Sequence, residues 1–394
     1  MESLDQYAER KVEELSARAL KRELFETNRS ELMRVEHAGH EYVSFCCNDY
    51  LGLANDQRTI AAAQAAAKKF GVGAGSSRLV TGNHGLYTQL EESLADFKGT
   101  SGACIFGSGY LANLGIIPAL LGKSDLILID ELAHNCLFAG SSLSGATVKK
   151  IKHNSIKAFE DALAAHRHNH EKCMVIVEGV YSMDGDRAPL KELASVSSKY
   201  DAWLLCDDAH GFGVSQTGRG SIEMANVAPT QIPLQVGTFS KAIGSYGGYL
   251  CASKPVIELV RTRVRTLIYS TGLPPSAIAA AIAALDIIRA EPDRVNRPLQ
   301  FASAFAQNIR GQSWQSQIVP IICFDPKIAL TASAQLREDG FLVSAIRAPT
   351  VPKGQDRLRI SFTAAHTDAD VDRFTDAVLK LKETVINPPK TLSA

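Results

Sequence analysis

A lysine and an aspartate stand where apolar segments end. Lys241 lies among small residues in the segment TFSKAIG, and Asp207 ends the apolar segment WLLCD. A lone lysine usually keeps its charge in water, but in an enclosed site the pKa of an amine falls and the amine can form a Schiff base. The pair predicts a pyridoxal phosphate site, because that cofactor needs a lysine for its aldehyde and an acid for its pyridinium nitrogen. Asp208 is the weaker ring partner, because adjacent strand residues point to opposite faces.

Further candidate residues follow other predicted strands. Gly109 and Tyr110 lie in the segment GSGY between a strand and a helix, where free backbone N–H groups and a positive helix end can bind a phosphate. The His134 ring can stack on a planar cofactor, or it is an ordinary hydrogen-bonded loop histidine. Ser182 and His210 stand where each could bond a ring oxygen.

The elements that position these residues alternate between helix and strand. The strands are predicted at residues 103–106, 126–130, 148–151, 174–178 and 203–206. Such alternation predicts an α/β fold, with a mostly parallel sheet sandwiched by helices. Ligands bind at the carboxyl ends of the strands in such sheets, and the candidate residues all follow strand ends.

Three parts are predicted along the chain. Residues 1–45 form an N-terminal arm, with an amphipathic helix followed by a hairpin. Residues 46–290 form the large cofactor-binding domain, because the long Ala-rich helix stops at Glu291-Pro292. Residues 291–394 form a smaller α+β C-terminal domain.

The composition excludes several function classes. The 394 residues carry 42 Lys+Arg and 42 Asp+Glu, so the net charge is zero. This balance argues against nucleic-acid binding and against a membrane-surface patch. No signal peptide is predicted, and no apolar run reaches the roughly 18 residues of a spanning helix. The eight cysteines show no C-x-x-C spacing and are predicted to be reduced thiols, which favours the cytoplasm.

One histidine-rich segment invites a metal interpretation. Residues 166–170 read HRHNH, but they lie at a polar helix end without a carboxylate or cysteine at ligand spacing. We expect a solvated surface there and no metal.

Six segments together resemble a known family. They are NDYLGL (48–53), EGVYSMDGD (178–186), DDAHGFG (207–213), TFSKAIG (238–244), YSTGLPP (269–275) and APTVPKGQDRLRIS (348–361). The chain resembles the α-oxoamine synthases, which are fold-type I pyridoxal-phosphate enzymes, over nearly its whole length. The resemblance implies a PLP-dependent acyltransferase with pyridoxal 5'-phosphate as its cofactor. Ser76-Ser77 stands where many relatives have a Gly-Gly pair.

The resemblance implies a role for each matching position around the cofactor. The Schiff-base lysine is Lys241, the pyridinium partner is Asp207, the stacking ring is His134, the ring-oxygen partners are Ser182 and His210, and the phosphate partners are Gly109, Tyr110 and Thr238. Thr271 would bind the phosphate of the neighbouring subunit, which implies a homodimer with shared active sites.

The resemblance also implies substrate-binding residues. Asn48 and Arg359 would hold the amino-acid carboxylate, since an arginine fork matches a carboxylate. Thr350 and Arg347 would lie near the acyl substrate. A basic residue near the chain start, in the segment Lys21-Arg22, would contact the same substrate, and we take it to be Arg22.

The reaction that the resemblance implies is a condensation of an amino acid with an acyl thioester. The segments DDAHG with GRGS, and IRAPTVP with RLR, favour L-alanine and a pimeloyl thioester. Two alternatives stay open. One is a sister synthase that uses glycine or serine with another acyl-CoA. The other is a non-catalytic partner protein of the same fold, which Lys241 and the chain length disfavour.

Overall fold

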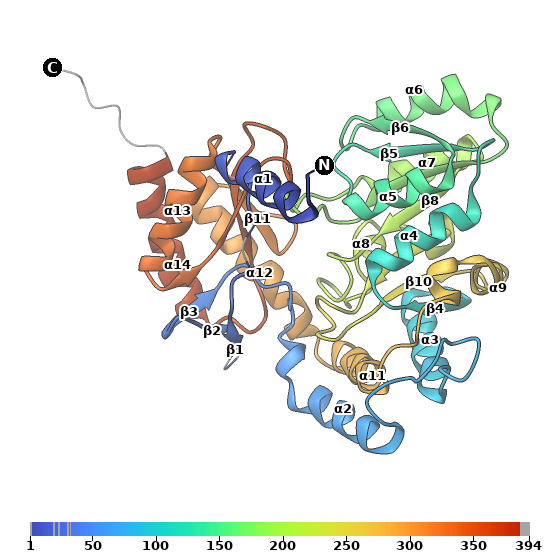
Figure 1. Ribbon diagram of the computed structural model, residues 1–394, viewed down its shortest axis with the longest axis horizontal. Coiled ribbons are helices and arrows are strands. Elements are labelled where there is room, and N and C mark those ends of the chain that lie inside the picture. Colours follow the sequence, from blue (N-terminus) through green and yellow to red (C-terminus); the bar gives the residue numbers. More distant parts are fainter. Residues whose placement is uncertain (1, 19, 23, 30, 32, 387–394) are drawn as a thin grey trace.

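Two bodies lie side by side in the computed structural model, which describes residues 2–18, 20–22, 24–29, 31 and 33–386 (Figure 1). The larger body contains the central sheet, and the smaller one contains the C-terminal elements. Residue 1 and residues 387–394, the ends of the predicted first and third parts, lie outside the described residues.

The large body is built on a seven-stranded sheet. Its strands are β4 (Gly102–Phe106), β5 (Leu126–Asp130), β6 (Thr147–Ile151), β7 (Cys173–Glu178), β8 (Trp203–Asp207), β9 (Leu234–Thr238) and β10 (Gly248–Ala252). The order is β4-β10-β9-β8-β7-β5-β6, and the pairs from β9 to β6 are all parallel. Only β10 runs antiparallel to its two neighbours, β4 and β9. The predicted mostly parallel α/β sheet is confirmed.

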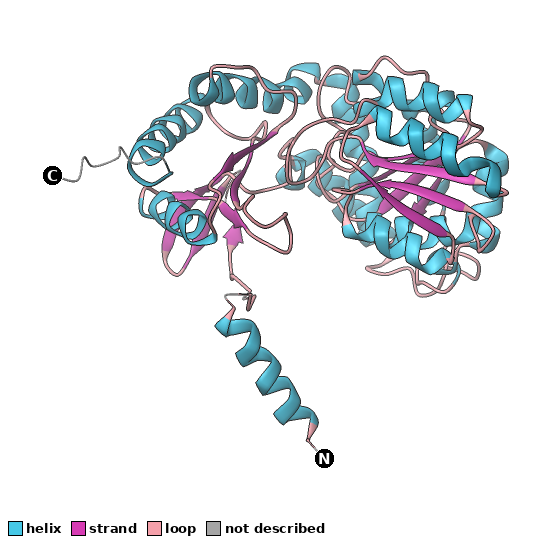
Figure 2. Cartoon of the chain, turned by 90° about the horizontal axis from the view of Figure 1, so that it is seen from above, coloured by secondary structure: helices cyan, strands magenta, loops and turns pink. Residues whose placement is uncertain are grey.

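Helices cover both faces of this sheet (Figure 2). One face packs on α4 (Gly109–Leu120), α5 (Asn135–Ser144), α9 (Lys254–Arg263) and α10 (Arg265–Ile268). The other face packs on α3 (Gly85–Lys98), α6 (Ile156–His166), α7 (Leu190–Lys199), α8 (Ser221–Met224) and α11 (Pro275–Ala290). Helix α2 (Gln57–Phe70) packs on α11. Strand β5 shows why both faces need cover. Ile127 and Ile129 point into one core while Leu126 and Leu128 point into the other, and all four are fully buried.

The small body has two sheets. Its helices are α12 (Pro292–Arg310), α13 (Pro326–Glu338) and α14 (Asp368–Leu381), and its strands are β11 (Ile318–Ile322), β12 (Phe341–Leu342), β13 (Ser344–Ile346) and β14 (Arg357–Ser361). Three strands form an antiparallel sheet in the order β11-β14-β13. The second sheet has the order β1-β2-β3-β12, and its members β1 (Asn28–Arg29), β2 (Arg34–His37) and β3 (His40–Ser44) come from the N-terminal part.

The predicted N-terminal arm, residues 1–45, is therefore divided between two parts of the structure. The predicted hairpin is present as β2 and β3, but β3 pairs in parallel with β12, so residues 34–44 are part of the small body. Only α1 (Leu4–Ala17) stands away from the rest, and it has no buried residue (Figure 2). No helix in the described part of the chain is long and apolar enough to cross a membrane.

Candidate active site

Adjacent strand ends bring the predicted cofactor residues to one edge of the sheet. Asp207 is the last residue of β8 and pairs in register with Glu178, the last residue of β7. Thr238 ends the next strand, β9, and Lys241 lies in the turn that follows. His134 follows β5 and precedes α5. Parallel strands place their carboxyl ends together, and this is why residues from four segments meet.

A chain of hydrogen bonds links Lys241 to the segment NDYLGL at residues 48–53. Lys241 Nζ lies 2.8 Å from His210 Nε2, and His210 Nδ1 lies 2.7 Å from the hydroxyl of Tyr50. The Tyr50 hydroxyl donates to Asn48 Oδ1 at 3.1 Å. Because that hydroxyl has one proton, His210 Nδ1 is then the N–H donor to Tyr50, and Nε2 accepts from Lys241.

Arg359, which belongs to the small body, is the last member of this hydrogen-bonded chain. Its Nη2 donates to Asn48 Oδ1 at 3.2 Å, and its Nε donates to the carbonyl of Ser182 at 2.6 Å. The side chain is buried, and its Nη1 donates to the Ser361 hydroxyl at 2.8 Å. The structure thus brings together Asn48 and Arg359, the two residues predicted to hold a carboxylate, beside the loop that carries Ser182.

The side chains of Asp207 and Asp208 point to opposite faces of the sheet and have different partners. The Asp207 carboxylate accepts from Asn113 Nδ2 at 2.6 Å and from the backbone N–H of Ala209 at 3.0 Å. Asp208 points the other way and forms a buried ion pair with Lys98 at 2.9 Å. The prediction that Asp208 is the weaker ring partner agrees with this geometry.

Burial sets the protonation of the site. It lowers the pKa of Lys241 to about 8, although the carboxylates of Asp207 and Glu178 favour the charged amine. Burial and the Asp207 charge raise the pKa of Glu178 to about 8. Burial also lowers the pKa of His210 well below its ordinary value, so its ring is neutral. A neutral imidazole and a weakly basic amine are suited to covalent chemistry at the Lys241 nitrogen.

The residues present fit a phosphate at the start of α4. Ser108 caps this helix by accepting from the Leu111 N–H at 3.1 Å, and Gly109 and Tyr110 begin it. A Cβ atom at Gly109 would lie 3.3 Å from the Thr238 side chain, so the glycine keeps that space open. Thr238 Oγ1 lies 2.8 Å from Ser240 Oγ, which adds hydroxyls to the helix-end N–H groups.

The predicted acyl-binding residues surround a separate cavity of about 230 Å³. Its lining includes Arg22, Arg347 and Thr350, with Leu20 and Pro349. Residues 345–350, which line this cavity, belong to the same small body as Arg359. Thr271 lies elsewhere, on an exposed segment that pairs with Ser77 in an isolated bridge.

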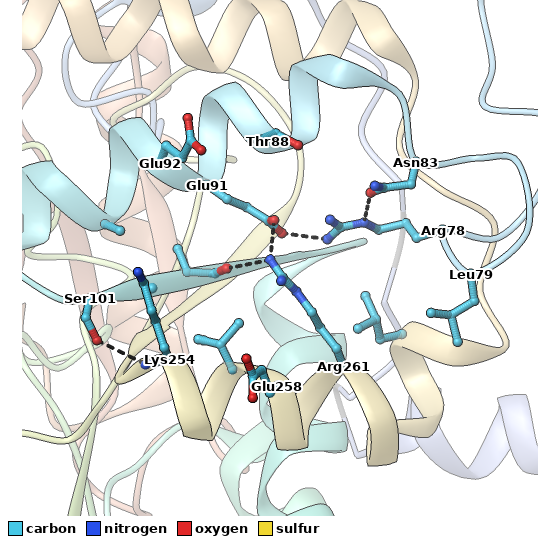
Figure 3. Close-up of a pocket in the computed structure, with 15 residues that line it drawn as sticks. Arg78, Leu79, Asn83, Thr88, Glu91, Glu92, Ser101, Lys254, Glu258 and Arg261 are labelled. Carbon is cyan, nitrogen blue, oxygen red and sulfur yellow. Dashed lines mark hydrogen bonds and ion pairs between the residues drawn. The ribbon is translucent and has the colours of Figure 1, made fainter.

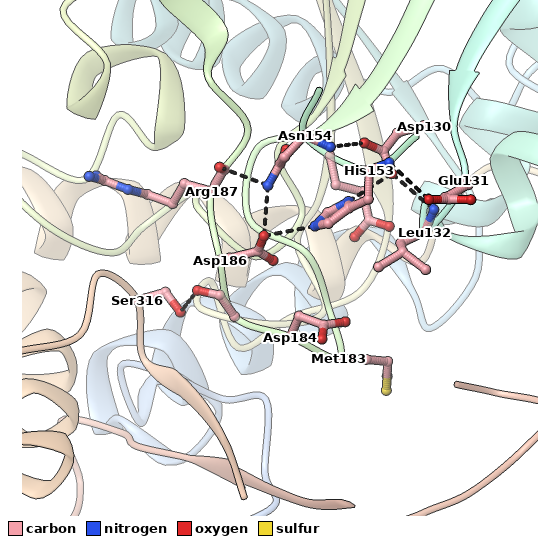
Figure 4. A network of polar contacts seen from close by, with 12 residues as sticks. Asp130, Glu131, Leu132, His153, Asn154, Met183, Asp184, Asp186, Arg187 and Ser316 are labelled. Carbon is pink, nitrogen blue, oxygen red and sulfur yellow. Dashed lines mark hydrogen bonds and ion pairs between the residues drawn. The ribbon is translucent and has the colours of Figure 1, made fainter. Parts of the chain in front are cut away.

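Two other polar clusters lie outside the predicted site. In a cavity of about 420 Å³ between α3 and α9, the buried carboxylate of Glu91 bonds Arg78 at 2.7 Å and Arg261 at 2.6 Å (Figure 3). The cluster in Figure 4 holds His153 between Asp130 and Asp186, at 2.9 and 2.8 Å. The first cavity is lined by three acidic and three basic side chains, so its formal charges balance. The second cluster connects β5 to the loop that carries Ser182.

Sequence reasoning missed three residues of the site. Asn113 and Tyr50 contact Asp207 and His210 directly, and Glu178 lies beside Asp207 with one carboxyl oxygen unpaired. The sequence does distinguish Asn113, since it is the one amide in the apolar helix GYLANLGIIPAL. No group of three or more His, Cys, Asp or Glu able to hold a metal occurs among the described residues.

Comparison with known proteins places this site in a family. Residues 40–378 match the model of the class I and II aminotransferases. An 8-amino-7-oxononanoate synthase from Beijerinckia indica is 52% identical over 97% of this chain and 98% of that protein. A similar protein from Methylocella silvestris, of the same name, is 54% identical over 88% of this chain and 98% of its own length.

Solved structures agree with these relatives. A serine palmitoyltransferase from S. paucimobilis with bound PLP-myriocin aldimine superposes with a TM-score of 0.90 at 30% identity, and the match covers 96% of this chain and 97% of that one. An 8-amino-7-oxononanoate synthase from Francisella tularensis gives a TM-score of 0.75 at 26% identity over 87% and 98% of the two chains.

The chain belongs to the class I and II aminotransferase family and, within it, to the family of the 8-amino-7-oxononanoate synthases. The resemblance to the α-oxoamine synthases and the fold-type I architecture are both confirmed.

Proposed function

We propose that the chain is a PLP-dependent acyltransferase of biotin biosynthesis. It condenses L-alanine with pimeloyl-CoA, or with a pimeloyl-carrier-protein thioester, to 8-amino-7-oxononanoate. CO2 and the free thiol are released. The support is the name and identity of its relatives together with the site around Lys241.

One observation carries this proposal. The hydrogen-bonded chain Arg359, Asn48, Tyr50, His210 and Lys241 joins a carboxylate-binding fork to a weakly basic amine. An amino acid whose carboxylate lies at Arg359 and Asn48 has its amine and Cα directed toward Lys241. Such an arrangement binds the small substrate at both ends and fixes its orientation.

Each residue has a defined task in the condensation. Pyridoxal phosphate, when bound, supplies an electron sink for the pair left on Cα. Asp207, held by Asn113, provides the negative charge for the pyridinium nitrogen. Lys241 would hold the aldehyde of the cofactor, and its side chain as a free amine would take the proton from Cα of the bound amino acid. Cα then bonds to the thioester carbonyl carbon as the thiol leaves, the carboxylate departs as CO2, and a proton returns to Cα.

The acyl end of the substrate is assigned to the second cavity. Arg22, Arg347 and Thr350 line it, and the two guanidinium groups suit the distal carboxylate of a pimeloyl chain. The cavity-lining segment continues from β13, where Ser344 pairs with Arg359, and this proximity supports binding of one substrate end near each of them.

Turnover with paired substrates tests the proposal. Purified protein loaded with pyridoxal phosphate is given L-alanine, glycine or L-serine with pimeloyl-CoA, acetyl-CoA or palmitoyl-CoA, and thiol release is measured. We expect release with L-alanine and pimeloyl-CoA, and loss of that release in Lys241→Ala. Preferred turnover of glycine or serine with another thioester would instead indicate a sister synthase. A cofactor-binding protein without turnover of any pair would overturn the enzyme proposal.

We also propose that the protein is a homodimer with shared active sites. The exposed segment with Thr271 lies beside the loop of residues 71–82, which contains four glycines, and Val72, Val80 and Tyr269 on these two segments are 84%, 73% and 77% exposed. Such apolar exposure is typical of a covered interface.

Subunit mixing tests the shared site. Lys241→Ala and Thr271→Ala subunits are unfolded, mixed and refolded together. If each site takes Lys241 from one subunit and Thr271 from the other, mixed dimers regain one intact site and the sample about a quarter of wild-type activity. No recovery in dimers confirmed by sedimentation would contradict sharing.

The compartment is a further proposal. We infer the cytoplasm, because all eight cysteines are free and six of them are buried thiols.

A further inference from the structure

Helix α4 connects the predicted phosphate site at its N-terminus with the carboxylate of Asp207. Gly109 begins the helix, and Asn113 lies one turn later on its buried side. Asn113 Nδ2 lies 2.6 Å from Asp207 Oδ2 and 3.3 Å from Cys136 Sγ. Because an amide nitrogen carries two protons, it can donate to both atoms at once. The flipped amide would set an oxygen against the Asp207 carboxylate, so only this orientation is favourable.

Cys136 continues the network to His134. The backbone N–H of Cys136 donates to His134 Nδ1 at 3.2 Å, and its Sγ lies 2.9 Å from the same nitrogen. Burial raises the pKa of the Cys136 thiol to about 12, so the sulfur keeps its proton. His134 Nδ1 is therefore an acceptor, and the ring proton lies on Nε2. The His134 ring is held in one tautomer from the α5 side.

The two helices are also held closely together. A Cβ atom at Gly140 of α5 would lie 2.5 Å from the carbonyl oxygen of Asn113, so α5 can approach α4 this closely only with a glycine there. The backbones that carry Asn113 and Cys136 thus have little freedom to move apart.

We propose that Asn113 and Cys136 are positioning residues that hold in place the Asp207 carboxylate, at the nitrogen edge of the cofactor ring, and the His134 ring, on one of its faces. This inference rests on the proposed function, in which Asp207 binds the pyridinium nitrogen and His134 stacks on the ring. The network is buried behind both groups, so it acts through them and does not touch substrate. The Asp207 carboxylate accepts from Asn113 and Ala209 and still has lone pairs for a third donor.

Cofactor binding by the full-length apoprotein tests the role of Asn113. The dissociation constant for pyridoxal phosphate is measured at pH 6 and pH 8 by absorbance titration for Asn113→Asp and Asn113→Leu. We expect both variants to bind about 10- to 100-fold more weakly at pH 8, because the charged acceptor loses its donor. Asn113→Asp should regain affinity at pH 6, where the new carboxyl can hold a proton and donate to Asp207. Asn113→Leu should not regain affinity at pH 6, because leucine has no donor.

A matched variant separates this effect from a general loss of packing. Asn296, on α12, donates through Nδ2 to the carbonyl oxygens of Gln216 at 3.1 Å and Pro292 at 2.8 Å, outside the site and outside the loops that carry it, so Asn296→Asp removes an amide donor there. We expect its cofactor affinity to stay within about twofold of wild type. If Asn113→Leu does not fold, the isosteric Asn113→Asp decides alone. Wild-type affinity of Asn113→Asp at both pH values would overturn the inference.

The role of Cys136 has its own spectroscopic test. Visible circular dichroism of the bound cofactor reports the asymmetry of its surroundings. We expect Cys136→Ala to change this signal, since His134 loses a partner, and Cys136→Ser to restore it through its hydroxyl donor. Cys173→Ala removes the same atoms from another buried free cysteine, at the opposite end of β7, and should leave the signal unchanged. An unchanged signal in Cys136→Ala would overturn this half of the inference.

Asp207→Asn distinguishes the inference from the proposed function. If Asp207→Asn weakens cofactor binding while the Asn113 variants bind normally, the positioning role fails and the function stands. If Asp207→Asn also binds normally, the assignment of Asp207 itself fails.

Discussion

The Nζ atom of Lys241 lies 2.8 Å from Nε2 of His210. Both side chains are enclosed at the strand ends, and burial lowers the pKa of each group, that of Lys241 to about 8. The neutral ring accepts a hydrogen bond from the Lys241 ammonium and brings no second positive charge into the site. This contact places an amine that loses its proton near neutral pH at the centre of the site.

The first prediction concerns the pH dependence of cofactor attachment. Only the unprotonated amine attacks an aldehyde, so the attachment rate should rise about tenfold per pH unit below the Lys241 pKa and level off above pH 8. Stopped-flow absorbance of the apoprotein mixed with pyridoxal phosphate measures this rate, and butylamine serves as the model amine. A rate that still rises at pH 10, as it does for an ordinary lysine, would contradict the assignment.

The second prediction concerns stability at high pH. Burial opposes a charge on His153, but its bonds to Asp130 and Asp186 outweigh that and raise its pKa to about 10. The folded state therefore holds this proton more tightly than the unfolded state, whose histidine pKa is about 6.5. The stabilisation is fully present below pH 6.5 and is lost as pH rises toward 10.

His153→Gln measures this contribution. We expect it to cost about 2–3 kcal/mol at pH 6 and much less at pH 10, from urea unfolding at several pH values. His168→Gln, at an exposed position of the 3-10 helix η2 (Arg167–Asn169), is the control. A cost that does not change with pH would mean that the ring is not charged in the folded state.

Much of the fold and site followed from local patterns. Strand-end positions predicted that Asp207, Thr238 and Lys241 meet, because a parallel sheet gathers its carboxyl ends at one edge. The motifs, read by resemblance, added Asn48 and Arg359, which the structure places within hydrogen-bonding distance of each other. These inferences needed only short segments and the rules that govern how strands align.

The remainder depends on contacts that no local pattern encodes. The pairing of β3 with β12 joins segments about 300 residues apart, and it moved part of the predicted arm into the small body. Asn113 lies within an apolar helix, and only the packing of α4 over β9 and β10 brings its amide to Asp207 at the end of β8. The cavity predicted to bind the acyl substrate joins Arg22 to residues 345–350 in the same non-local way.

The third prediction separates the two substrates. Arg359→Lys loses the planar fork, so the KM for L-alanine should rise about 10- to 100-fold while the KM for the thioester changes little. Arg373→Lys, an exposed arginine over the Phe341 ring in the same body, should leave both constants unchanged. Steady-state kinetics with each substrate varied in turn measures this. An equal rise in both constants would place Arg359 outside the amino-acid site.

The last prediction concerns the separate partners of Asp207 and Asp208. The Asp208 carboxylate lies 2.9 Å from Lys98 Nζ with both side chains almost fully buried, and it also accepts from the Ser221 N–H at 3.1 Å. Lys98→Met leaves that charge without its partner, so we expect a loss of about 3–5 kcal/mol of unfolding free energy. Because Asp208 points away from the cofactor edge, the affinity for pyridoxal phosphate should stay within about twofold of wild type.

The double variant Lys98→Met with Asp208→Asn completes a thermodynamic cycle. Removing both charges should recover at least 1 kcal/mol relative to Lys98→Met alone, since about that much of the penalty comes from an unpaired buried carboxylate. Chemical denaturation of the apoprotein measures the four corners of the cycle, and cofactor titration runs in parallel. Additive losses would show that the ion pair has no coupling, and a large fall in cofactor affinity in Lys98→Met would show that the two faces of this strand end are not independent.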